Sequence, residues 1–152
     1  MKRILVIIAL ITLMFSMNAV AMDNMKGMKG MDHGSKNDGE AFSYTAMVDS
    51  IRAKFQIMDL ASMNMKDPKG NTHHVMATFM KDNKKITELA GKVKLISPSG
   101  KEQIGTFKDY GSGVFAANFK IDEPGKWGVI SLFKESGNKH TVKFWYHNMM
   151  KM

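Results

Sequence analysis

The stretch that decides the fold is Thr72-His73-His74-Val75-Met76-Ala77-Thr78-Phe79-Met80. It contains β-branched and aromatic residues, has no Gly or Pro, and lies between turn-rich segments, so it predicts a β-strand. Successive side chains of a strand point to opposite faces. His73 therefore shares a face with Val75, Ala77 and Phe79, which is the better face for the core. The opposite face carries His74, Met76, Thr78 and Met80.

The second face of this strand is a candidate metal site. His74 and Met76 are two residues apart, so their Cα atoms lie roughly 6.5–7 Å apart and both side chains can reach one ion. We expect these two residues, rather than His73, to anchor the site. A β-bulge near Asn71 would exchange the roles of the two histidines. The alternative is that Met fills gaps in packing and His faces solvent.

Strand-like segments recur along the chain with turns between them. An alternating pattern at Phe42-Ser43-Tyr44 begins the folded part, and we expect strands near residues 51–60, 72–80, 92–95, 103–110, 114–121, 126–134 and 140–147. Short strands at this spacing, with no long helical period, predict an all-β antiparallel β-sandwich of about seven strands. In the last strand Val142, Phe144 and Tyr146 should face the core. We expect His140, at its start, to be a solvated surface residue.

The N-terminal residues have the pattern of a secretory signal. Lys2 and Arg3 precede an apolar run over residues 4–15, and Ala19-Val20-Ala21 is a typical cleavage site. The run is short for a membrane span, so we expect a periplasmic or otherwise exported chain without stable membrane insertion. The predicted parts are a signal peptide over 1–21, a tail over 22–41 and a β-sandwich domain over 42–152. The chain has no Cys, so its stability must come from an ordinary core.

Methionine is unusually frequent, with 16 residues in 152. In the tail, apart from Met, there is no large apolar residue, so a role in core packing cannot explain the methionines there. They recur every third residue, and an extended chain with three residues per turn would place them along one edge. Thioether and imidazole donors without a thiolate favour Cu(I). The tail ligands predicted in this way are Met22, Met25, Met28, Met31 and His33.

Other His and Met residues lie where the fold could bring them to the domain site. Met63 and Met65 precede the His-His strand across a turn, so a hairpin would bring them close to it. His147 and Met149 form a second His/Met set at the chain's end, and the alternative is a frayed terminus with scattered Met. With Met80, and with His73 should a β-bulge exchange the two histidines, these complete the predicted metal ligands.

Charge and motifs exclude other classes of function. The formal net charge is +8, but the lysines are spread along the chain rather than clustered, so we expect no nucleic-acid partner. The chain has no G-x-S-x-G, P-loop, H-E-x-x-H or paired-Cys motif. We therefore expect a binding protein rather than an enzyme.

Four motifs resemble the YtkA-like/FixH-like group of small exported domains. They are His73-His74-Val75-Met76, the turn Pro98-Ser99-Gly100, the segment Gly113-Val114-Phe115-Ala116-Ala117-Asn118-Phe119 and the turn Pro124-Gly125-Lys126-Trp127. The resemblance covers about residues 50–147. It implies an immunoglobulin-like sandwich and a role in handling copper or another metal in the cell envelope. It carries over no ligand set.

These observations predict a non-enzymatic exported protein that binds copper as Cu(I) and acts as chaperone, buffer or resistance factor. Its partners would be the metal ion and a membrane copper transporter or an oxidase assembly factor. The alternative is a structural or adaptor sandwich of the envelope that uses Met as an adaptable contact surface.

The first prediction concerns the tail. Because residues 22–40 have almost nothing to bury, a chain that starts at Ala41 should keep the melting temperature of the chain that starts at Met22. Differential scanning calorimetry on both, without metal, measures this. A large drop in the shorter chain would show that the tail is part of the fold.

Overall fold

The computed structural model describes residues 41–149. By its contacts the chain divides into two units, Met1–Asp32 and His33–Met152, and all of the described residues belong to the second. The predicted signal peptide and the Met/His-rich tail lie outside the described residues. No helix in the described part of the chain is long and apolar enough to cross a membrane.

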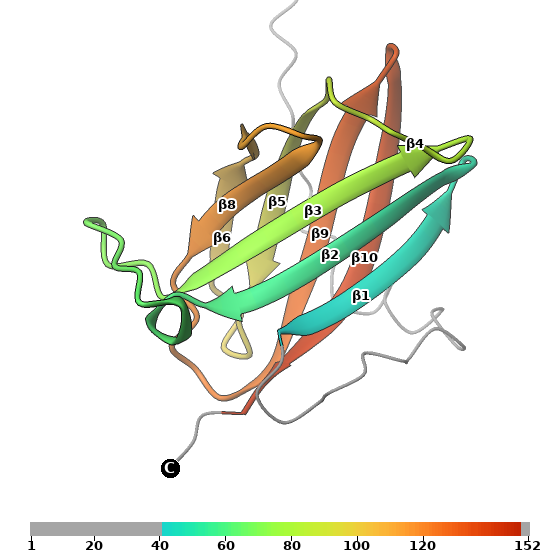
Figure 1. Cartoon of the computed structure of the whole chain (residues 1–152). Helices are drawn as coiled ribbons and strands as arrows, with labels where there is room; N and C mark the ends of the chain where they lie inside the picture. Colours follow the sequence, from blue (N-terminus) through green and yellow to red (C-terminus); the bar gives the residue numbers. More distant parts are fainter. Residues whose placement is uncertain (1–40, 150–152) are drawn as a thin grey trace, which may run out of the picture. The chain divides into compact units, whose positions relative to one another are not determined.

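The described unit is built almost wholly from antiparallel strands (Figure 1). In chain order the elements are β1 Phe42–Val48, β2 Ile51–Asp59, the 3-10 turn η2 Ala61–Met63, β3 His73–Lys81, β4 Lys84–Lys85, β5 Ala90–Ile96, β6 Glu102–Thr106, β7 Lys108–Asp109, β8 Val114–Phe119, β9 Gly125–Glu135 and β10 Asn138–Asn148. The all-β class predicted from the sequence is confirmed.

The strands form two sheets. Sheet A has the order β1-β2-β3-β8-β7, with β4 paired to the end of β3, and sheet B has the order β10-β9-β5-β6. The four strands β2-β3-β8-β7 match the A-B-E-D order of an immunoglobulin domain, and sheet B matches its G-F-C order with one further strand. β1 adds a strand outside that pattern. The predicted immunoglobulin-like sandwich is therefore present, with short extra strands that raise the count above seven.

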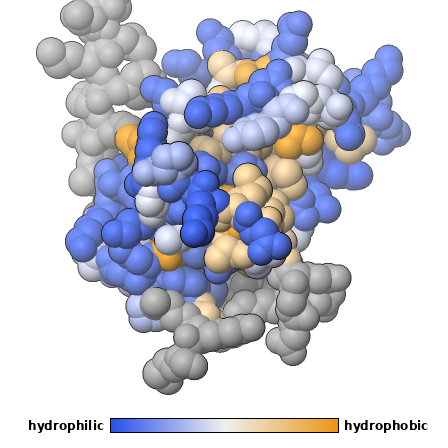
Figure 2. Space-filling model, turned by 60° about the vertical axis from the view of Figure 1, so that its left-hand side comes forward, coloured by the Kyte–Doolittle hydropathy of each residue, from blue (hydrophilic) through white to orange (hydrophobic). Residues whose placement is uncertain are grey.

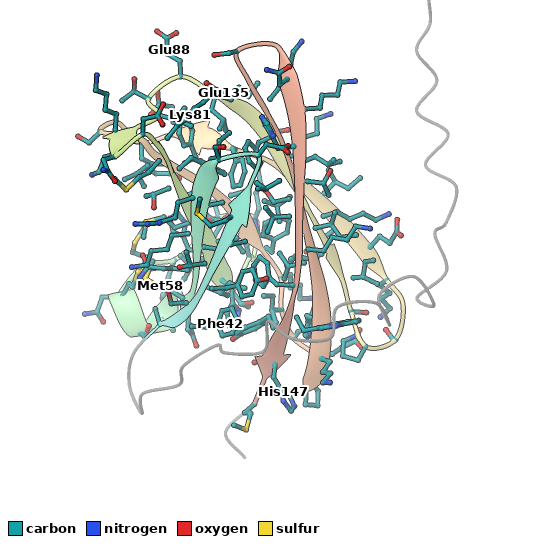
Figure 3. All side chains as sticks on the ribbon, turned by 90° about the vertical axis from the view of Figure 1, so that its right-hand side faces the viewer. Phe42, Met58, Lys81, Glu88, Glu135 and His147 are labelled. Carbon is teal, nitrogen blue, oxygen red and sulfur yellow. The ribbon has the colours of Figure 1, made fainter. Side chains whose placement is uncertain are left out.

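The core lies between the sheets and is rich in aromatic rings. Phe79 of β3 contacts the ring of Phe133 on β9, with ring centroids 4.4 Å apart, and so joins the two sheets. Tyr44 stacks on Phe144 at 4.5 Å and joins β1 to β10. At the margin of the core, Lys81 Nζ lies 3.4 Å from Glu135 Oε2 and links the sheets again (Figure 3).

The strand predicted over residues 103–110 is divided in the structure. Residues 102–106 pair with β5 in sheet B, and residues 108–109 pair with β8 in sheet A. The change of sheet occurs at Phe107, whose side chain is buried and whose backbone N–H donates to the carbonyl oxygen of Gly91. The buried ring fixes the crossing point, because it fills the space between the sheets where the chain passes from one to the other.

The prediction that His140 is a solvated surface residue is wrong. Its side chain is buried, Nδ1 lies 2.8 Å from Asp49 Oδ2, and the ring stacks on Phe133. The reason is the alternation of β10, which places His140 on the same inward face as Val142 and Phe144. The carboxylate of Asp49, at the turn after β1, is the partner of Nδ1, whereas Nε2 is buried with no hydrogen-bond partner among the described residues.

The close approach of Phe107 to β5 generates the second prediction. A Cβ on Gly91 would lie 2.7 Å from Phe107 Cδ2 and 3.0 Å from the Leu132 carbonyl oxygen, which cannot move away easily. We expect Gly91→Ala to lower the free energy of unfolding by about 1–3 kcal/mol, the usual cost of overpacking. Urea denaturation measures it.

Gly128→Ala is the matched control, because a Cβ there would meet Trp145 and Ile96 at ordinary contact distances of 3.5 and 3.6 Å. It should change the free energy of unfolding much less. Equal effects of the two substitutions would contradict the packing described for Phe107.

Candidate metal centre

β3 presents its histidines to opposite sides of sheet A, as predicted. Its buried and half-buried residues alternate without interruption from His73 to Met80, and both neighbouring strands keep a continuous register beside it. His73 is buried on the core side, and His74 and Met76 point outward and are half-buried. No bulge exchanges the two histidines.

The register of sheet A adds a thioether that sequence reasoning missed. Met58 of β2 is the direct cross-strand partner of His74, and it lies on the outer face of the sheet (Figure 3). Side chains at directly opposed positions have Cβ atoms about 4.5–5.5 Å apart, and diagonal neighbours about 7–8 Å. Met58 is thus opposite His74 and diagonal to Met76. One imidazole and two thioethers therefore stand together on this face.

Asn118 of β8 holds the His74 ring from the other side. Asn118 Oδ1 lies 2.7 Å from His74 Nδ1, and Asn118 Nδ2 donates to Asp67 Oδ2 at 2.8 Å. A carboxylate only accepts hydrogen bonds, so Asp67 fixes which end of the amide faces His74. The amide oxygen also only accepts, so Nδ1 of His74 must carry the proton. In the neutral ring this leaves the lone pair on Nε2, which is the form in which imidazole binds a metal.

Asp67 is itself held by three donors. Asn71 Nδ2 donates to Oδ2 at 2.9 Å and the backbone N–H of Lys69 donates to Oδ1 at 2.7 Å, in addition to the bond from Asn118. The hydrogen bonds from Asn71 and Asn118, followed by that from Lys69, lower the pKa of the Asp67 carboxyl. Asp67 therefore remains an acceptor over a wide pH range, and the orientation of Asn118 is maintained.

A groove lies between the β2–β3 loop, β6 and β8, and two of the residues that line it, Asn118 and Tyr110, contact His74. Its volume is about 700 Å³, and its lining includes Asn118, Asp67 and Tyr110. The exposed Tyr110 ring also meets the His74 ring edge to face, with centroids 5.6 Å apart. Figure 2 shows the side of the molecule that lies to the left in Figure 1, where hydrophilic side chains surround a patch of moderately hydrophobic ones. The candidate site is thus open to solvent at one side rather than enclosed.

The structure separates several predicted ligands from His74. Met80 is six residues further along the same face, about 20 Å at strand rise, and its cross-strand partners are Arg52 and Lys85. His147 lies on the outward side of β10 in sheet B, and the exposed Met149 follows that strand (Figure 3). These two residues are together, but the thickness of the sandwich lies between them and His74.

Met63 and Met65 lie in the loop that joins β2 to β3, as the hairpin prediction required. Backbone N–H groups of both residues donate to the carbonyl oxygen of Leu60, and Leu60 in turn donates to Thr72. The loop therefore starts and ends next to Met58 and His74. Met63 is half-buried and Met65 is exposed. The tail residues Met22, Met25, Met28, Met31 and His33 lie outside the described residues.

The kind of donor present restricts the kind of metal. Residues 41–149 contain no group of three or more His, Cys, Asp or Glu side chains placed to hold a metal ion. A site at Met58, His74 and Met76 would therefore rely on sulfur and one nitrogen. Soft thioether and imidazole donors suit Cu(I), and they suit Mg²⁺ or Ca²⁺ poorly because those ions prefer oxygen.

The comparisons with known proteins bear on the fold. The chain is similar to the crystal structure of a DUF4426 family protein from Pseudomonas aeruginosa PAO1, with a TM-score of 0.60 and 12% sequence identity, over 71% of this chain and 98% of the other. No family model matches the chain, and no curated protein matches it. The class that fold and site together define is an immunoglobulin-like β-sandwich with a cluster of His and Met on one outer face. The YtkA-like/FixH-like resemblance stays a prediction.

The burial of His73 generates the third prediction. Desolvation lowers the pKa of its imidazole, and the nearby charge of Asp59 opposes this only in part. Below pH about 6.5 the unfolded chain takes up a proton at this residue that the folded chain still refuses. The free energy of unfolding should therefore fall as the pH decreases from about 7 through the lowered pKa.

His73→Phe keeps a ring in place and removes this titration. Urea denaturation near pH 7.5 and pH 5.5 should show a smaller loss of stability in the variant than in the original chain. An equal loss in both would mean that other groups cause the pH dependence.

Proposed function

We propose that this chain is an exported, non-enzymatic copper-binding protein whose domain holds Cu(I) at Met58, His74 and Met76. One observation carries the proposal: the Asp67–Asn118–His74 hydrogen-bond chain leaves Nε2 of His74 as the donor atom beside two thioethers. A metal-binding histidine usually donates its second ring N–H to a carboxylate, a backbone carbonyl or a water, and here the amide oxygen of Asn118 is the acceptor.

The arrangement suits transfer of the ion more than permanent storage. Thioether ligands bind Cu(I) without a charge of their own, and the site lies on an outer face beside an open groove. An ion there is reachable by another protein. We therefore assign the role of chaperone, buffer or resistance factor, with a membrane copper transporter or an oxidase assembly factor as the partner that exchanges the ion.

The N-terminal pattern and the family resemblance support the same proposal. Export would follow from the charged and apolar segments before Ala21, and the tail ligands Met22 to His33 would supply further soft donors in the same compartment. Membership of the YtkA-like/FixH-like group is supported by the turn at residues 97–100, by β8, and by Trp127, whose Nε1 donates to the Glu123 carbonyl oxygen across the P-G-x-W turn.

The fourth prediction tests the domain site by Cu(I) titration against a competing chelator, in a chain that starts at Ala41 so that the tail does not contribute. His74→Ala, Met76→Ala and Met58→Leu should each lower the affinity about tenfold or more. Met80→Leu is the matched control, because it removes a thioether from the same face about 20 Å away. Unchanged affinity in the His74 and Met76 variants would remove the site from this strand.

Asn118→Leu tests the orientation of the imidazole. It removes the acceptor for Nδ1 while leaving all three proposed ligands, and loss of such an outer partner typically costs 10–100-fold in metal affinity. Gln103→Leu is the control, since the Gln103 amide bonds the backbone of Lys120 and not His74. Equal effects of the two substitutions on Cu(I) affinity would contradict the role given to Asn118.

A further inference from the structure

The outer face of sheet B has a composition different from that of sheet A. Lysines project outward from three of its strands: Lys92 and Lys94 on β5, Lys126 and Lys134 on β9, Lys139 and Lys143 on β10. In the described part of the chain, Glu102 of β6 is the one acidic residue at an outward strand position of this sheet. Its Oε1 lies 2.6 Å from Lys94 Nζ. We call this surface the basic face.

Large apolar side chains lie between the lysines. They are Ile96, Ile104, Ile130, Leu132 and Trp145. The register places Ile130 and Ile104 on either side of Lys94, and Gly128 between Trp145 and Ile96. A Cβ on Gly128 would lie 3.5 Å from Trp145 Cζ3, so the indole leans over the glycine and makes an apolar strip with Ile96. Ile104 is 59% exposed.

We propose that the basic face docks the protein on an anionic lipid surface. Lysine chains with aliphatic and indole groups between them are the composition of protein surfaces that lie at the headgroup boundary of anionic bilayers. The ammonium groups of exposed lysines such as Lys92, Lys126 and Lys134 meet the lipid phosphates, and Trp145 and the isoleucines meet the upper part of the acyl region. Lys94 takes no part in this, because it is buried and paired with Glu102. This is adsorption on one side of a bilayer, and it is independent of the copper site on sheet A.

Two other occupants fit the face less well. A second copy of the chain would bring two sets of lysines together, which repel each other. A specific protein partner would favour a different composition, because protein interfaces are enriched in Arg and depleted in Lys. All six cations of the basic face are lysines, and the one arginine of the described residues, Arg52, lies on β2 of the other sheet.

The experiment is co-sedimentation of the chain that starts at Met22 with vesicles of phosphatidylcholine, with and without phosphatidylglycerol. We expect binding only to the anionic vesicles, weakening as salt is raised because the charges are exposed. Lys92→Glu with Lys143→Glu should reduce the binding at least tenfold. Arg52→Glu with Lys54→Glu is the matched control, since it makes the same change in net charge on the outer face of sheet A. It should bind nearly as the original chain does.

Tryptophan fluorescence gives a second, independent measurement. The chain has two tryptophans, and Trp127 is buried in the core. A blue shift on adding anionic vesicles should therefore come from Trp145 and disappear in Trp145→Phe, with folding checked by circular dichroism for every variant.

Three results would overturn the proposal. One is equal loss of binding in the two double variants, which would indicate net charge alone. Another is binding without any Trp145-dependent shift. The third is binding to soluble polyglutamate as tight as to the anionic vesicles, which would indicate an acidic protein partner instead.

Discussion

The packing of the Phe79 ring against its neighbours is the interaction on which the arrangement of the rest of the domain depends. It faces the core from the middle of sheet A and meets four other rings, Phe55, Phe107, Phe115 and Phe133. These belong to β2, the crossing between β6 and β7, β8 and β9, so one side chain joins neighbours within sheet A to sheet B. Aromatic pairs at such distances add to the energy of burial itself. Because the side chains of a strand alternate between its two faces, the inward direction of Phe79 also sets the direction of the remaining β3 side chains.

The inward direction of Phe79 also determines where the candidate site lies, although Phe79 is not part of that site. With Phe79, Ala77 and Val75 inward, His74 and Met76 must point outward, and the core itself specifies which histidine faces solvent. The hydrogen bonds on the outer face then set the orientation and the tautomer of the His74 ring. A carboxylate on the β2–β3 loop orients an amide on β8, and the amide selects the tautomer of a histidine on β3. Core packing therefore sets the position of His74, and a polar network between three segments sets its chemistry.

Sequence patterns were sufficient where one face of a strand is uniformly apolar. The inward sets of β2, β3 and β8 could be predicted from alternation alone, and so could the sandwich. The same rule applied to Val142 and Phe144 places His140 inside, whereas the polarity of a histidine at the start of a strand favours exposure. Lys94 differs from its pattern for a related reason: its ammonium is paired with Glu102, so an outward lysine becomes buried.

Contacts between segments that are far apart in the chain could not be predicted from the sequence. That Met58 lies opposite His74 depends on the register of β2 against β3, and the loop of thirteen residues between Asp59 and His73 leaves that register open. The partnership of His74 with Asn118 spans 44 residues. The change of sheet at Phe107 depends on the space that Gly91 leaves for its ring. In each case a contact between strands decides the outcome, and no local pattern encodes it.

The two outer faces of the sandwich carry different kinds of side chains. Sheet A presents neutral sulfur and nitrogen donors, with Met58, His74 and Met76 close together, whereas sheet B presents lysines around an apolar strip. Donors pressed against a lipid surface would be inaccessible to a partner. Placing the proposed copper site and the basic face on opposite sides of the sandwich avoids that conflict. A domain that rests on a bilayer through sheet B would present His74 away from it, where a second protein could take up the ion.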